Sequence, residues 1–132
     1  MGGILYCIFR SLWISGWSVA GGTLIDLDHL YDYARYPYRP ESRGFDLRHF
    51  FEVLTSARLV KVYVLLHSWE LVAMVLVAGW FHPAAGVALI PLGFGMAIHV
   101  LLDAFTNPTS IIGYSIISRS AHRFAGTFFF RR

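Results

Sequence analysis

The sequence predicts an all-α integral membrane protein, a helical bundle folded as a single domain over residues 1–132. Charged residues make up 14% of the chain and hydrophobic residues 56%, and the mean hydropathy is +0.54. A soluble domain carries about a quarter charged residues, so this chain is too apolar for that class. Two apolar segments are also long enough to cross a bilayer, which takes roughly 20 helical residues.

About three spanning or re-entrant helices are expected. The N-terminal stretch, residues 3–25, is apolar apart from Arg10, and its small residues favour close helix packing: Gly16, Ala20, Gly21 and Gly22. The segments Val60–Trp80 and Ala84–Phe105 are predicted to be antiparallel neighbours, because only "FHP" separates them. Pro91 interrupts the backbone hydrogen bonding of the last helix, so a neighbouring group must satisfy the carbonyl that it releases.

The cationic residues predict the orientation. They gather in the polar loop 31–59 and in the C-terminal tail, and the "FHP" turn has none. The positive-inside rule therefore places loop and tail in the cytoplasm and the turn outside. Interfacial helices are expected in both regions, one with an apolar face at Phe45, Phe50, Val53 and Leu54. We read the net charge of +3 as this topology signal and expect no nucleic-acid partner.

Three groups of ionisable residues interrupt the apolar segments. "GGTLIDLDHL" contains Asp26, Asp28 and His29; "LHSWE" contains His67 and Glu70; "IHVLLD" contains His99 and Asp103. Helical spacing puts each His on a face with a carboxylate. The orientation, drawn from Arg and Lys alone, places all three groups at the cytoplasmic end. Charged groups in membrane segments usually mark function, so we expect them to converge on one buried site.

Imidazole and carboxylate groups together suit a divalent metal, most naturally zinc, with manganese or magnesium as alternatives. The candidate ligands are Asp26, Asp28, His29, His67, Glu70, His99 and Asp103. They exceed what one tetrahedral zinc needs, so either two ions bind or some groups orient ligands or act in catalysis. The lone Cys7 allows neither an intramolecular disulfide nor a cysteine-type zinc site. The alternative interpretations are a hydrated helix end at Asp26 and hydrogen-bonded pairs between helices.

These motifs resemble those of the YdjM-like bacterial proteins, predicted membrane-bound metal-dependent hydrolases. The resemblance rests on "GGTLIDLDHL", "LHSWE" and "GMAIHVLLDAFTNPTSIIG", in this order. It implies roles for the aspartate and histidine residues above, and for Ser68, Thr106 and Gly113. Leu66 stands where the family has Thr, and Glu70 is an added carboxylate. The resemblance also implies the bacterial inner membrane as the location.

The expected function is metal-dependent hydrolysis of lipid-like phosphoesters or esters, with Glu70 or Asp28 as the general base. The alternative is a non-catalytic membrane protein whose buried cluster binds or moves ions, or fixes helix packing. The expected surroundings are the lipid bilayer and a lipid-like substrate, and a homo-oligomer is left open.

Overall fold

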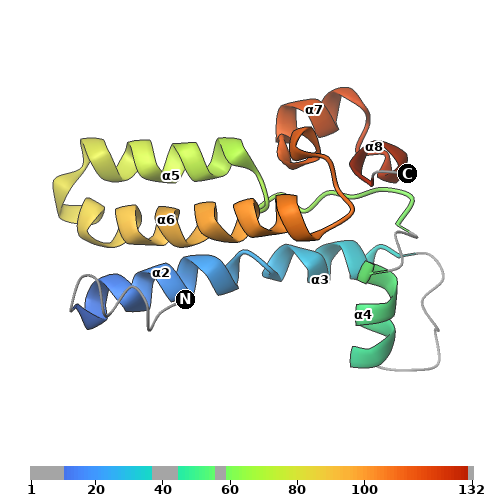
Figure 1. The fold of residues 1–132 in the computed structure, drawn as a ribbon, viewed down its shortest axis with the longest axis horizontal. Coiled ribbons are helices and arrows are strands. Elements are labelled where there is room, and N and C mark those ends of the chain that lie inside the picture. Colours follow the sequence, from blue (N-terminus) through green and yellow to red (C-terminus); the bar gives the residue numbers. More distant parts are fainter. Residues whose placement is uncertain (1–10, 37–44, 56–58, 131–132) are drawn as a thin grey trace.

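The computed structural model describes residues 11–36, 45–55 and 59–130, and over these residues the fold is all-α with no sheet (Figure 1). Only two isolated β-bridges occur in the described part of the chain. The elements are α2 (Leu12–Leu24), α3 (Leu27–Ala34), α4 (Leu47–Thr55), α5 (Trp69–Phe81), α6 (Pro83–Thr106), the short 3-10 helix η1 (Ile111–Tyr114), α7 (Ile116–Ala121) and α8 (Gly126–Phe129).

Helices α5, α6 and α2 lie side by side in one layer with α6 in the middle (Figure 1). Helix α5 turns back on α6 as the short "FHP" connection predicts, and α2 runs in the same direction as α6. With 24 residues, α6 is long and apolar enough to cross a membrane, in agreement with the predicted segment Ala84–Phe105. Helix α5 has only 13 residues, so the predicted span over Val60–Trp80 is wrong in its first half.

Small residues let the backbones of α2 and α6 touch. A Cβ atom added to Gly95 would lie 1.9 Å from the carbonyl oxygen of Ser18, and one added to Gly21 would lie 2.1 Å from that of Leu92. Such distances leave no room for a methyl group. The predicted small-residue face is therefore present at Gly21, whereas a Cβ at Gly16 would meet nothing within 4 Å.

A side chain of α2 satisfies the Val87 carbonyl, which Pro91 leaves without its helical hydrogen bond. Helix α6 continues through Pro91, which has no N–H to donate to the oxygen of Val87 four residues earlier. The indole Nε1 of Trp13 in α2 donates to that oxygen at 3.1 Å. The sequence-based expectation that a neighbouring group satisfies this carbonyl is confirmed.

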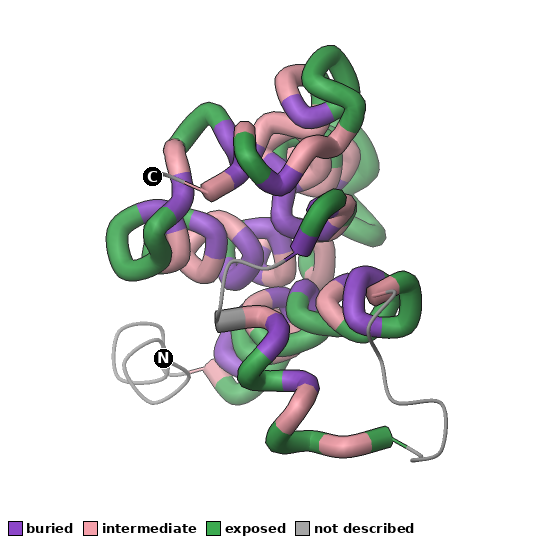
Figure 2. Tube along the Cα trace, turned by 90° about the vertical axis from the view of Figure 1, so that its right-hand side faces the viewer, coloured by how far each residue is buried: buried purple, intermediate pink, exposed green. Residues whose placement is uncertain are grey.

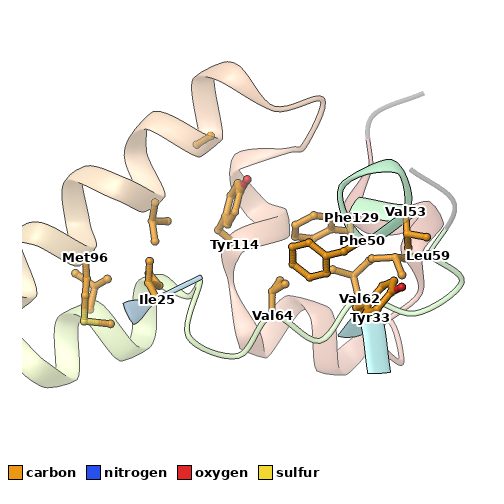
Figure 3. Close-up of a cluster of buried hydrophobic side chains, with 13 residues drawn as sticks. Ile25, Tyr33, Phe50, Val53, Leu59, Val62, Val64, Met96, Tyr114 and Phe129 are labelled. Carbon is orange, nitrogen blue, oxygen red and sulfur yellow. The ribbon is translucent and has the colours of Figure 1, made fainter. Parts of the chain in front are cut away.

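The remaining elements fold together at the end of the helical layer where α6 ends (Figure 1). Helix α3 follows α2 after a break at Ile25 and Asp26, and α4 buries Phe50 and Val53 in the core. Tyr114 and Phe129 join the same core from the C-terminal elements (Figure 3). In Figure 2 the buried positions lie mainly where elements face one another.

Candidate metal centre

An extended segment, residues 59–68, carries His67 to the site. Two carboxylates of α3 hold its backbone: Asp32 accepts from the N–H of Tyr63 at 2.9 Å and of Val64 at 3.2 Å. Asp28 accepts from the N–H of Leu66 at 2.7 Å and of His67 at 3.2 Å. These donors would otherwise bond within a helix, so the two aspartates explain why residues 60–68 are not helical. Val64 has a φ of +28°, a strained conformation for a β-branched residue.

Arg119 of α7 holds the same segment from its carbonyl side. Its side chain is buried and donates to the carbonyl oxygens of Tyr63 at 2.6 Å, Val64 at 2.8 Å and His67 at 3.1 Å. Arg119 was expected in an interfacial tail and Asp32 in a polar loop, so neither residue was predicted at the site. For Asp32 a signal was present, because Asp28 and Asp32 are four residues apart and share a helix face.

Four side chains converge where α2, α5 and α6 meet this segment. Nε2 of His67 lies 3.4 Å from Oδ1 of Asp26 and 3.5 Å from Oδ2 of Asp103. Nε2 of His99 lies 3.2 Å from the same oxygen of Asp26 and 3.5 Å from the same oxygen of Asp103. Residues from three distant parts of the sequence thus point one donor atom each at a common centre.

The distances between the histidine nitrogens and the carboxylate oxygens agree with those of a tetrahedral zinc site. Ligand atoms roughly 2.0–2.1 Å from zinc lie roughly 3.3–3.4 Å from one another in a tetrahedron. The four distances between the histidine nitrogens and the carboxylate oxygens are 3.2–3.5 Å. The donor atoms of Asp26, His67 and His99 are close enough together to hold one ion.

Asp28 orients His67. The Asp28 carboxylate, only 7% exposed, lies 3.0 Å from Nδ1 of His67, so it selects the tautomer with the proton on Nδ1. In the neutral ring, Nε2 of His67 then carries no proton, and its lone pair faces the cluster. It is buried and has no hydrogen-bond partner among the described residues, as expected of a nitrogen reserved for a metal.

The charges of the site also favour a cation. Partial burial opposes ionisation of Asp26, but its contacts with the His67 and His99 rings hold its pKa well below the usual value. Burial lowers the pKa of His29, which favours the neutral ring. Burial opposes protonation of His67, but its contacts with Asp26 and Asp28 raise its pKa above the usual value. The site therefore offers ionised carboxylates, and a metal would displace a proton from the ring of His67 on binding.

A second group could hold an ion, formed by Asp28, His29 and His67. Its carboxylate is already occupied, because Asp28 accepts from two backbone N–H groups and contacts the ring of His67. The Nδ1 of His29 is buried without a hydrogen-bond partner in the described structure. His29 therefore lies beside the group formed by Asp26, His67 and His99, and Asp28 orients His67 within that group.

Glu70, predicted to share the site with His67, is directed elsewhere. Oε1 accepts from the hydroxyl of Ser115 at 2.5 Å, and Oε2 accepts from the N–H of Ile116 at 3.0 Å. The prediction assumed a helix through residues 67–70, but the helix begins at Trp69 with Ser68 as its N-cap. Glu70 instead caps the N-terminus of α7, a favourable position for a carboxylate.

A cavity of about 540 Å³ adjoins the cluster, within the range of small-molecule sites. Asp26, His29, His67 and Asp103 contribute to its lining, and most of the rest is apolar. The side chains of His82 and His122, which the sequence placed outside the cluster, are exposed. No family model, curated protein or solved structure matches this chain.

Proposed function

We propose that this chain is a membrane-embedded, metal-dependent hydrolase that acts on lipid-like substrates. The observation that carries the proposal is the convergence of Asp26, His67, His99 and Asp103 beside a cavity, with nitrogen-to-oxygen distances of 3.2–3.5 Å that suit one tetrahedral ion. Zinc suits this mixture of imidazole and carboxylate best, with manganese or magnesium as alternatives.

The outer surface supports a location in the membrane. Beside the apolar helix α6, large apolar side chains are exposed on α5 and α2, among them Trp80 at 76%, Met74 at 62% and Leu12 at 78%. Many exposed large apolar side chains on neighbouring helices favour contact with lipid or protein. We propose a location in the bacterial inner membrane, which the family resemblance implies, with the C-terminus in the cytoplasm as the cationic residues predict.

The chemistry divides among the residues as follows. A bound metal would lower the pKa of its water and polarise the scissile group. His67, His99 and Asp103 would hold the metal, with the proton of His67 kept on Nδ1 by Asp28. Asp26, whose side chain is 51% exposed, lies at the edge of the cluster and contributes to the cavity lining. It is the fourth ligand or the general base. Glu70, occupied at α7, is assigned neither role.

Metal analysis and activity of one variant series test this proposal. His67→Ala and His99→Ala should lose most of the bound metal, whereas His82→Ala and His122→Ala should retain it. Asp26→Asn separates two roles. If Asp26 is a ligand, the variant should bind less metal. If Asp26 is the general base, the variant should keep its metal but lose about 10²–10⁴-fold in rate. Equal metal in all variants would refute the site. Absence of turnover by metal-loaded protein on a panel of lipid esters and phosphoesters would refute hydrolysis.

The four protein donors also favour a second candidate function, in which an ion fixes helix packing without catalysis. Structural zinc sites are closed by four protein ligands, and a catalytic site keeps a position for water. Here the ligands join the end of α2, the extended segment and α6. Under this alternative, chelation should lower the thermal stability of the wild type sharply, and no substrate should be turned over.

A further inference from the structure

We infer that the cavity beside the cluster binds a single acyl chain of an uncharged lipid ester. This inference rests on the proposed hydrolase function and names its substrate class. It follows from three features of the cavity. Its walls are apolar and formed by buried residues, its rim is apolar, and the ionisable side chains of its described lining are carboxylates and imidazoles, with no Lys or Arg.

The walls are core residues. Phe50, Leu59, Val62, Val64 and Phe129 line the cavity, and each is at most 8% exposed (Figure 3). They come from α4, the extended segment and α8, so elements far apart in the sequence line the cavity. The cavity volume of about 540 Å³ is within the range of small-molecule sites, and its apolar walls favour an apolar occupant. An alkyl chain has the shape and polarity that such walls accept.

The rim is apolar as well. Leu27, Leu30 and Phe51 belong to the lining and are 54%, 43% and 55% exposed. Leu27 and Leu30 lie on α3, and Phe51 lies on α4. An alkyl chain that enters past these side chains leaves one apolar environment for another, which fits entry from a bilayer rather than from water.

The carboxylate and imidazole groups of the lining form one cluster. Asp26 lies 3.4 Å from His67 and 3.8 Å from His29, and Asp103 lies 3.5 Å from His67. A chain in the apolar part therefore has its polar end at the proposed metal centre. The arrangement suits a molecule with one long apolar part and one reacting group.

The described lining contains no Lys or Arg. Arg119 is not part of this lining, and its guanidinium donates to the carbonyl oxygens of residues 63, 64 and 67. Sites that bind phosphate groups usually present Arg or Lys. An uncharged carboxylic ester therefore fits better than a phosphoester. In its hydrolysis, the oxygen of water bonds to the carbonyl carbon, the ester C–O bond breaks, and the departing alkoxide takes a proton from that water.

Photo-crosslinking tests this placement without requiring turnover. The probe is a monoacylglycerol with a diazirine in its acyl chain, added to protein in phosphatidylcholine nanodiscs. Labels should map to residues 45–55 and 59–67 in the wild type. They should appear equally in His99→Ala, which is expected to be inactive, so failure of hydrolysis alone leaves this result standing.

Filling the cavity supplies the matched comparison. Leu54→Trp, at a lining residue, should abolish most labelling of these segments. Val77→Trp should not, since Val77 is an exposed residue of α5 outside the lining. Labels confined to the outer surfaces of α2, α5 and α6, or unaffected by Leu54→Trp in folded protein, would overturn the inference.

Competition between two unlabelled lipids tests the charge of the ligand. A monoacylglycerol should displace the probe better than a lysophosphatidic acid of the same chain length, because the lining offers no cationic side chain to the phosphate. The opposite order in metal-free protein would overturn the assignment to an uncharged ester.

Discussion

Replacing Asp28 by Asn should weaken metal binding although Asp28 is outside the four-donor set. The Asp28 carboxylate accepts the N–H groups of Leu66 and His67 through Oδ2 and contacts Nδ1 of His67 through Oδ1. Asparagine has a single acceptor oxygen. If that oxygen keeps the backbone contacts, the amide NH₂ faces Nδ1 and favours the tautomer with the proton on Nε2. That proton occupies the position through which His67 would bind the metal.

The expected magnitude follows from these contacts. Loss of a carboxylate that orients a metal-binding histidine typically costs 10–100-fold in affinity, or roughly 1.4–2.7 kcal/mol. Loss of a hydrogen bond to a charged group should lower the free energy of unfolding by about 1.5–3 kcal/mol. Competition with a chromophoric zinc chelator measures the first effect. The ¹⁵N shifts of the His67 ring report the tautomer.

Asp32→Asn is the matched control. Asp32 lies on the same helix and also accepts backbone N–H groups of the extended segment, but no contact with a histidine ring is recorded for it. It should lower stability with a smaller loss of zinc affinity. If both variants lost zinc affinity equally, the tautomer argument would be refuted, because general loosening of the segment would then explain the effect.

Four further outcomes are expected. Gly95→Ala should lower the free energy of unfolding by about 1–3 kcal/mol, because the added methyl group overpacks α2 against α6. Gly16→Ala, where the methyl group meets open space, should raise it by about 0.5–1 kcal/mol. Equal effects of the two variants in thermal melts would contradict the close contact. Arg119→Lys should cost about 1–3 kcal/mol for each carbonyl left without a donor and should reduce zinc binding, and an unchanged chelator titration would argue against the role of Arg119. Burial raises the pKa of Asp32 from 3.8 to about 6, so the stability that its protonated form contributes is complete below about pH 4 and is lost as pH rises through 6. The unfolding free energy of wild type relative to Asp32→Asn should fall over this interval, and a rise would be the contrary result. A reporter inserted at His82 should report the outside of the cell, and a cytoplasmic signal would reverse the orientation.

The sequence by itself determined the all-α class, the long apolar helix and the meeting of the His and Asp residues. Each of these depends on local or additive properties. Apolar length predicts α6, and the i, i+4 spacing on one helix predicts the proximity of His99 and Asp103. The distribution of Arg and Lys predicts that Asp26 and His67 lie at the same end of the bundle, and the structure brings these four residues together.

Only the tertiary structure decided how the backbone reaches the site. Residues 60–68 are as apolar as a spanning helix, but Asp28, Asp32 and Arg119 bind the backbone groups that such a helix would use internally. Likewise, Glu70 caps α7 because α7 packs beside it, although its hydrogen-bond partner Ser115 lies 45 residues further along the chain. Hydrophobic periodicity reports which face of an element is buried. It does not report which distant polar group satisfies a backbone N–H or C=O, and at this site those pairings fix the position of His67.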